Sequence, residues 1–281
     1  MNKFSSRLPP AGTLADRYSW HASGIGDLSV YGQCWILDPK EHPFGNLNLG
    51  LGIKIPTGSW RVKAAIPDES GENRIGRYVW PPAIMPGDGG TGIIAGFEAF
   101  KTLRGLGFLR GQTLFASGSY LSNPRTTNGT PSVIRELGVP LTANFLNAVT
   151  NSVPDTYTVQ AGVAIKVPGT WDKKRWRGTR FRVVGHWEGL PSRDLIGGNA
   201  GFRQPGYALA VGPGLTYAYG RDMWLVDVPI VFNRHINPGK TLLPGLPVQT
   251  AAGLAPGKFN PFRNLGLVAP VSLAVRYVRT F

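Results

Sequence analysis

The sequence predicts an all-β protein, an antiparallel up-and-down transmembrane β-barrel. Three features of its 281 residues predict this fold: segments of strand length in which apolar and polar residues alternate, 38 glycines and 24 prolines that favour short strands and turns, and long connections that alternate with short ones. No apolar run approaches the roughly 18 to 20 residues that a membrane helix needs. A mean hydropathy of −0.08 fits a wall with one apolar and one polar face.

The alternation is clearest in residues 46–55 and 157–167. In the first of these segments every second residue is leucine or isoleucine, and the residues between them are Asn46, Asn48, Gly50, Gly52 and Lys54. In a strand, successive side chains point to opposite faces, so each segment has one apolar and one polar face. The same analysis predicts about nine strands, at 24–37, 46–55, 92–101, 112–122, 157–167, 180–188, 207–219, 223–233 and 271–281.

The connections give each strand a direction. The long ones, at 57–91, 123–155, 190–205 and 234–264, alternate with short turns. Outer-membrane barrels have long extracellular loops and short periplasmic turns. These directions predict an upper aromatic girdle of Tyr120, Tyr157, Tyr207 and Phe232, and a lower girdle of Phe181, Tyr219, Trp224 and Phe281.

The final strand is expected to run toward the periplasm and to close the barrel. Its lipid-facing residues, which would form the signal for barrel assembly, are Leu273, Val275, Tyr277 and Phe281. Arg279 departs from this pattern, because it falls on the same apolar face.

An odd strand count conflicts with the even number found in bacterial single-chain barrels. Residues 1–24 are expected to be irregular, with residues 25–281 forming the barrel, and the first ten residues do not form a signal peptide. We therefore expect that the chain begins inside a longer barrel, with at least one further strand before residue 24.

Composition argues against several classes of function. Thirty Lys and Arg against 16 Asp and Glu give a net charge of +14, which ordinarily raises nucleic-acid binding. Here the basic residues are spread along the chain, apart from one cluster at Lys173, Lys174, Arg175 and Arg177, so no nucleic-acid partner is expected. Cys34 is the single cysteine and the four histidines are scattered, so we expect no disulfide and no metal site. His186 beside many serines is not a specific sign of a nucleophilic site, so no catalytic site is expected. No cofactor is expected either, because glycine-rich phosphate sites need a strand-to-helix turn that the sequence lacks.

A set of charged residues falls on the inward face of the expected strands. These candidate pore-lining residues are Lys54, Glu98, Lys166, Arg180, Arg182, His186, Glu188 and Asp227. They would either line a polar path that favours anionic or polarisable solutes, or form ion pairs that fill a narrow barrel. Residues 86–90, with one carboxylate at Asp88, are expected to form a glycine-rich turn, because calcium takes six or more oxygen ligands.

Five short segments together resemble one family. Residues 24–27 (GIGD), 49–58 (LGLGIKIPTG), 86–90 (PGDGG), 152–155 (SVPD) and 202–207 (FRQPGY) occur in an order that is similar to outer-membrane transporters grouped with the meta-pathway of phenol degradation. The resemblance covers about residues 24–281. It implies a signal peptide and about three further strands before residue 24, which would make a barrel of about twelve strands. It also implies passage of small hydrophobic or aromatic molecules.

The leading functional hypothesis is a barrel in the bacterial outer membrane that lets such molecules pass without energy input. Its expected partners are outer-membrane lipid and lipopolysaccharide, the barrel-assembly machinery and a small-molecule solute. The alternatives are a non-transporting structural or adhesive barrel, and a soluble basic β-sandwich that binds polyanions. The solute, the state of the lumen and the oligomeric state are left open by the sequence.

Overall fold

The computed structural model describes residues 2–7, 17–67, 73–78, 85–105, 107–132, 149–167, 178–236 and 270–279. The largest element of this part of the chain is one antiparallel sheet of ten strands. Its strands are β3 (Leu28–Trp35), β4 (Gly45–Ile55), β7 (Gly92–Thr102), β8 (Thr113–Ser122), β11 (Thr156–Lys166), β12 (Arg180–Leu190), β13 (Gly206–Tyr219), β14 (Asp222–Asp227), β15 (Ile230–Ile236) and β16 (Ala274–Arg279).

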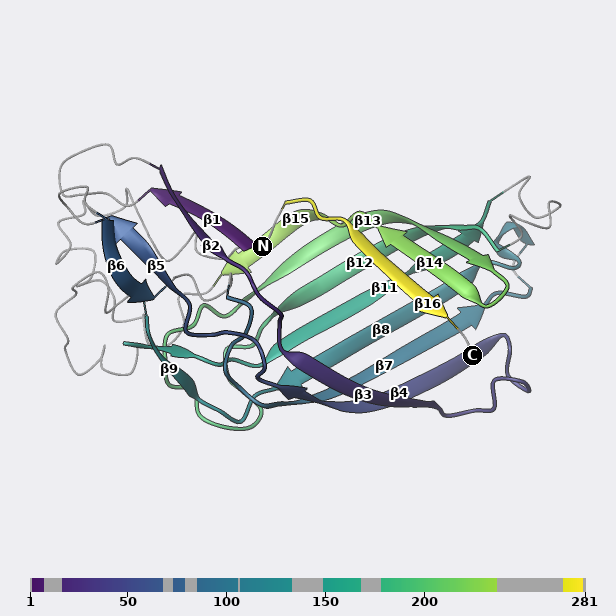
Figure 1. Ribbon diagram of the computed structural model, residues 1–281. Helices are drawn as coiled ribbons and strands as arrows, with labels where there is room; N and C mark the ends of the chain where they lie inside the picture. Colours follow the sequence, from purple (N-terminus) through teal and green to yellow (C-terminus); the bar gives the residue numbers. More distant parts are fainter. Residues whose placement is uncertain are drawn as a thin grey trace.

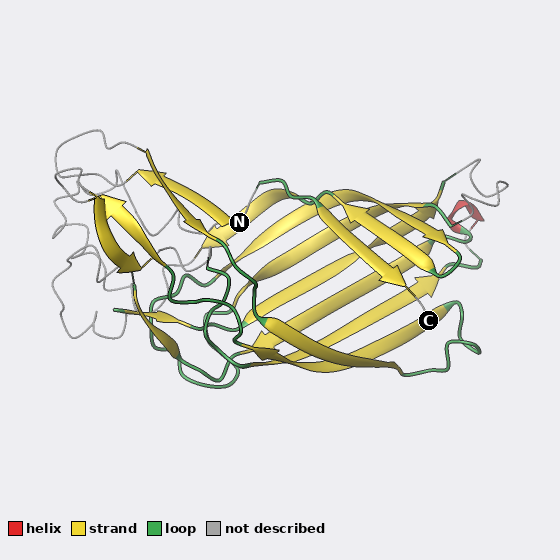
Figure 2. Ribbon diagram, viewed as in Figure 1, coloured by secondary structure: helices red, strands yellow, loops and turns green. Residues whose placement is uncertain are grey.

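The large sheet has an up-and-down topology. Its order is β16-β14-β13-β12-β11-β8-β7-β4-β3, and β15 also pairs with β13. Figure 1 shows this sheet curled into a half-barrel, which confirms the predicted all-β, antiparallel barrel architecture. The helix η2 (Gly107–Leu109) is one short turn (Figure 2). Among the described residues, no helix has the length and apolarity needed to cross a membrane.

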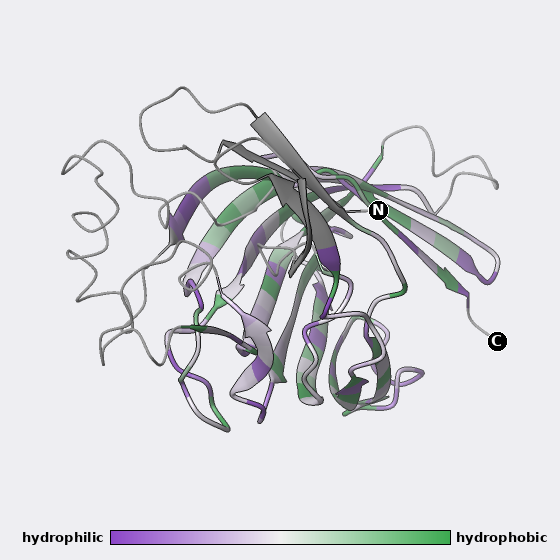
Figure 3. Cartoon of the chain, turned by 60° about the vertical axis from the view of Figure 1, so that its left-hand side comes forward, coloured by the Kyte–Doolittle hydropathy of each residue, from purple (hydrophilic) through white to green (hydrophobic). Residues whose placement is uncertain are grey.

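The two faces of the sheet are reversed relative to those of a water-soluble protein. On β4, Leu51 is 69% exposed and Ile53 is 50% exposed, whereas Asn48 is 2% exposed and Lys54 is 6% exposed. Figure 3 shows hydrophobic and hydrophilic residues alternating along the strands. The alternation seen in the sequence therefore places apolar side chains on the convex face and polar side chains inside.

The two ends of the half-barrel differ in their connections. The long connections meet at one end, here named the long-loop end, and the C-terminus lies at the other, the short-turn end (Figure 1). Both edge strands, β3 and β16, run from the long-loop end to the short-turn end, as their pairings with β4 and β14 require. Within the described residues, neither edge strand pairs with a further strand on its outer side.

Three small ladders accompany the large sheet, in segments that were expected to be irregular or to form loops. Their pairs are β1 (Asn2–Arg7) with β2 (Arg17–Ala22), β5 (Lys63–Pro67) with β6 (Asn73–Tyr78), and β9 (Thr127–Pro131) with β10 (Thr150–Ser152). The prediction that residues 1–24 lack regular structure is therefore wrong for β1 and β2. Runs of three to six residues are too short for a two-residue period to be read reliably.

Two expected strands also differ in extent. The strand predicted at 223–233 is divided into β14 and β15 by Pro229, which has no N–H to donate to a ladder. The last strand is shorter than 271–281, because Val271 makes only an isolated bridge to Ile230. Phe281, assigned to the assembly signal and to the lower girdle, lies outside the described residues.

Aromatic residues gather in rows across the strands at both ends. At the long-loop end, Tyr157 pairs with Tyr120 on one side and with Gly189 on the other, and Gly189 in turn pairs with Tyr207. Three members of the predicted upper girdle therefore lie in one row.

At the short-turn end, the Trp224 and Tyr277 rings are 4.7 Å apart. Arg279, on the same outer face, lies 3.8 Å from an Asp222 carboxylate oxygen. The ion pair gives a physical reason for a basic residue on the apolar side of β16 at its rim.

Candidate functional site: the inner face and the loop cap

The structure buries three of the eight predicted pore-lining residues. Lys54, Arg182 and Asp227 are each at most 9% exposed. Four others are half-buried on the inner register of their strands: Glu98, Lys166, Arg180 and His186. Glu188 shares that register but is exposed near the long-loop end of β12.

Arg182 and Asp227 form an ion pair on the inner face. The Arg182 Nη1 atom donates to Asp227 Oδ2 at 3.0 Å, across the intervening strand β13. Gly214 lies between them on β13, and a Cβ added there would be 2.0 Å from Asp227 Oδ1. The Arg182 guanidinium also lies 4.5 Å from the centre of the Phe115 ring. Glycine at position 214 therefore makes room for the carboxylate that holds this buried cation.

Glu98 and Arg276 interact across the hollow of the sheet. An Arg276 guanidinium nitrogen on β16 lies 3.7 Å from a Glu98 carboxylate oxygen on β7, although five strands separate β16 from β7 in the sheet order. Such a contact requires a strongly curled sheet. The sequence placed Glu98 on the inner face but did not indicate its partner.

Lys54, in contrast, is held at the long-loop end by two carboxylates. Its ammonium group lies 3.5 Å from Asp27 Oδ2 and donates a short hydrogen bond to Asp88 Oδ2. Asp27 Oδ1 accepts from the Gly58 amide at 2.9 Å, and Asp88 Oδ1 accepts from the Gly90 amide at 2.8 Å. Asp88, the carboxylate of the glycine-rich segment 86–90, therefore forms an ion pair with Lys54 that holds this segment at the end of β4.

Asp155 ties three more loops together at the same end. Its side chain is fully buried. Oδ1 accepts from the Asn123 amide at 2.6 Å, and Oδ2 accepts from the Tyr120 hydroxyl at 2.8 Å and from the Leu195 amide at 2.7 Å. A buried carboxylate needs such donors, because an unpaired charge there is costly.

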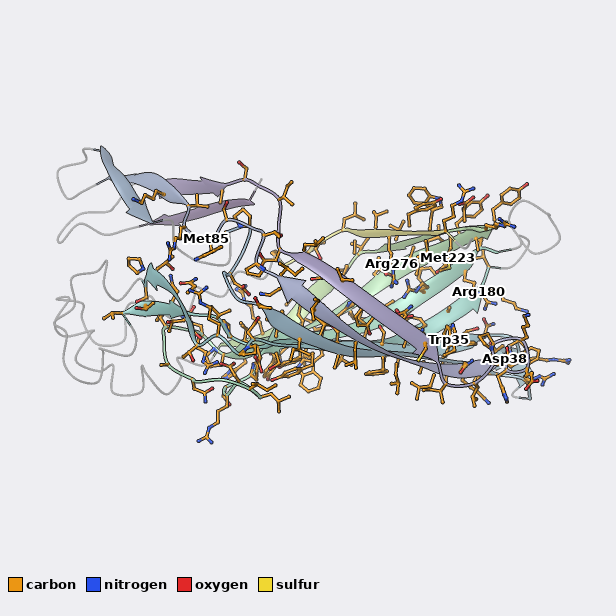
Figure 4. All side chains as sticks on the ribbon, turned by 60° about the horizontal axis from the view of Figure 1, so that its bottom comes forward. Trp35, Asp38, Met85, Arg180, Met223 and Arg276 are labelled. Carbon is orange, nitrogen blue, oxygen red and sulfur yellow. The ribbon has the colours of Figure 1, made fainter. Side chains whose placement is uncertain are left out.

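The network continues into the loop before β13. The Asp155 amide donates to Asp194 Oδ1 at 3.0 Å, and Arg203 Nη1 donates to the same oxygen at 2.6 Å. We name the joined segments 24–27, 56–60, 85–91, 123–126, 153–155 and 191–205 the loop cap. Figure 4 shows Met85 among these loops, with Arg180 and Trp35 toward the opposite end.

The five family-like segments of the sequence meet in the loop cap. Asp27 and Asp88 come from the first and third segments, Lys54 from the second, Asp155 from the fourth and Arg203 from the fifth. Reading the chain alone selected these segments but not their contacts. Three of the segments carry one aspartate each and the other two carry one basic residue each, and these opposite charges were the signal of a network in the sequence.

A second set of contacts that the sequence did not reveal surrounds Tyr31. A Cβ added at Gly50 would lie 2.2 Å from the Tyr31 hydroxyl oxygen, and one at Gly96 would lie 2.6 Å from it. At Gly52 the added atom would lie 2.8 Å from a Tyr31 ring carbon. The Tyr31 ring therefore lies over β4 and β7, where these three glycines leave space for it.

Comparison with known proteins adds no family assignment. No protein-family model matches the chain, and no curated protein matches it in sequence. Among the described residues, no group of three or more His, Cys, Asp or Glu side chains is arranged to hold a metal ion.

Proposed function

We propose that the chain forms the wall of a barrel in the bacterial outer membrane and lets small hydrophobic or aromatic molecules cross without energy input. The observation that carries the proposal is the reversal of the two faces. Apolar residues such as Leu51 and Phe232 are exposed, while Lys54, Arg182 and Asp227 are buried. A membrane barrel needs this arrangement, because its outer face contacts lipid.

The aromatic rows support the same orientation. Tyrosine and tryptophan favour the two interfaces of a bilayer, where the ring lies beside hydrocarbon and the polar atom stays hydrated. The upper row of Tyr120, Tyr157 and Tyr207 would then lie near lipopolysaccharide, and the lower row would face the periplasm. The resemblance to outer-membrane transporters of the phenol meta-pathway supports this location.

The inner face supports the passage of solutes that are partly aromatic. Phe100 and Phe115 are half-buried and share the inner register with Glu98 and Arg182. An inner face with both rings and charges suits molecules that carry an aromatic part. We propose passive diffusion as the mechanism, because a solute that exchanges weak contacts along the inner face needs no energy source.

Vesicles with lipopolysaccharide in the outer leaflet would test the proposal, because this leaflet slows hydrophobic molecules. The purified protein should raise the uptake of a hydrophobic naphthylamine dye above that of vesicles without protein. Uptake equal to that of protein-free vesicles would overturn the transport claim. Aqueous extraction without detergent gives a simpler test of location, since a protein released into the aqueous phase is not a membrane barrel.

A non-transporting structural or adhesive barrel is the second candidate. The loop cap favours it, because the ion pairs of Lys54 and the buried Asp155 tie the long loops together. Single-channel recording separates the two, since a plugged barrel is silent. A soluble β-sandwich that binds polyanions would instead pack its apolar residues between two sheets, and the exposed apolar face argues against it.

A further inference from the structure

Two cationic side chains lie together over the start of β4, at the short-turn end. Lys101, near the end of β7, is the cross-strand partner of Gly45, and a Cβ added at Gly45 would lie 2.8 Å from Lys101 Cδ. The Lys101 side chain therefore extends across Gly45. The Arg104 guanidinium carbon lies 3.9 Å from the centre of the Phe44 ring. Two positive charges thus lie over the consecutive residues 44 and 45.

Both cations are exposed and available to an anion. Among the described residues, neither Lys101 nor Arg104 forms an ion pair with a carboxylate. The exposed carboxylates of the described turns at this end are Asp38 and Glu41, and Asp38 already accepts a hydrogen bond from the Lys40 amide. The ammonium and guanidinium groups therefore present N–H donors to a partner outside the chain.

This pair of cations lies at the edge of the apolar outer face. Leu47 and Ala99, which are cross-strand partners, belong to that face. They are two residues away from Gly45 and Lys101, or roughly 7 Å along the strands. The Phe44 ring beside the cations is 41% exposed. A ring and long cationic side chains at the edge of an apolar band are typical of the level at which lipid phosphates lie.

The other side of the half-barrel repeats this arrangement at the same end. On its outer face, Trp224 and Tyr277 are each 46% exposed and Tyr219 is 55% exposed. Arg221 lies in the turn between β13 and β14, two residues after Tyr219, and is exposed. Cations therefore accompany exposed rings on both sides of this end. We name these residues the short-turn rim: Phe44, Lys101, Arg104, Tyr219, Arg221, Trp224 and Tyr277.

We infer that the short-turn rim binds the phosphate groups of anionic phospholipid in the periplasmic leaflet. The inference rests on the location in the proposed function and names a partner there. Ammonium and guanidinium groups donate charge-assisted hydrogen bonds to phosphate oxygens. Each cation near an anionic bilayer raises affinity by about fivefold. The acyl chains of the same lipid cover Phe44, Trp224 and Tyr277, which a water-soluble acidic protein would leave exposed.

Electron paramagnetic resonance of spin-labelled lipids tests this inference on the full chain in phosphatidylcholine vesicles. A labelled lipid that contacts the protein gives a motionally restricted signal, and the size of this signal measures its relative association. Labelled phosphatidylglycerol should associate about twofold more strongly than labelled phosphatidylcholine. Salt at about 1 M should reduce the difference, because it screens exposed charges.

The possible results separate the inference from the proposed function. Equal association of the two lipids would overturn the inference and leave the proposed function in place. If polyglutamate then bound through Lys101 and Arg104, the rim would instead belong to an acidic protein. If neither lipid gave a restricted signal, the protein would not contact lipid, and the location in the proposed function would fail.

A double variant, Lys101→Gln with Arg104→Gln, removes the two charges over residues 44 and 45. It should lower the preference for phosphatidylglycerol by about half, since Arg221 remains. Lys101→Arg with Arg104→Lys keeps both charges and should keep the preference. The matched control, Arg61→Gln with Arg234→Gln, removes two exposed cations at the long-loop end and should leave the preference unchanged. An equal loss in the control would show that net charge alone attracts the lipid and would overturn the inference.

Discussion

Asp155 should be the most costly single polar group to remove from the loop cap. Its two oxygens accept three hydrogen bonds from Asn123, Tyr120 and Leu195. In Asp155→Asn an amide nitrogen must face at least one of these donors, and in Asp155→Ala all three lose their acceptor. A buried donor without a partner costs about 1 to 3 kcal/mol. We expect the free energy of unfolding to fall by about 2 kcal/mol for asparagine and about 4 kcal/mol for alanine.

Urea unfolding in detergent micelles, followed by tryptophan fluorescence, measures this loss. Hydrogen exchange at the Asn123 and Leu195 amides reports whether the cap opens locally, in which case exchange accelerates even if global unfolding changes less. Asp38→Asn is the control, because Asp38 is exposed and accepts a bond from the Lys40 amide. It should change stability by less than about 0.5 kcal/mol. If Asp155→Asn matches the unsubstituted protein in both measurements, Asp155 does not hold the loops together.

Three further experiments test the inner face and the outer face. Gly50→Val should destabilise the fold by about 1 to 3 kcal/mol through collision with Tyr31, and Tyr31→Ala should relieve most of that loss in urea unfolding. Leu51→Arg should cost about 2 to 4 kcal/mol in lipid vesicles, because the charge would lie in hydrocarbon; a neutral effect would argue against a lipid-facing β4. Arg182→Met and Asp227→Asn should each cost about 3 to 5 kcal/mol, and the double variant should cost less than their sum; additive losses would show that the two groups do not interact.

The strands of the wall were predictable because their alternation is local. In β4 and β11 every second residue is apolar over nine residues, and each strand was found in the structure within two residues of its predicted bounds. The break between β14 and β15 at Pro229 was harder to predict from the sequence, since a proline can also occupy the first position of a strand. The ladder of β1 and β2 was missed because six residues carry too little of the period.

The contacts of the candidate site depend on register and loop folding, which a single sequence does not specify. The inward position of Arg182 followed from alternation, but its pairing with Asp227 needed the alignment of three strands. The contacts of Tyr31 were not predicted, because Gly50 leaves room for its side chain only when β3 lies beside β4 in this register. The buried role of Asp155 depends on backbone amides from distant loops, which no side-chain pattern encodes.

Spin labelling along β13 tests the central claim, that the convex face contacts lipid, most directly. In a Cys34→Ala background, single cysteines would replace Ala208, Leu209, Ala210 and Val211, which alternate between buried and more exposed positions. For protein in lipid vesicles, labels at 209 and 211 should collide more with oxygen, which concentrates in hydrocarbon, than with a water-soluble nickel chelate. Labels at 208 and 210 should not share that preference. Equal collision at all four positions, or nickel contact at 209 and 211, would contradict a lipid-facing barrel wall.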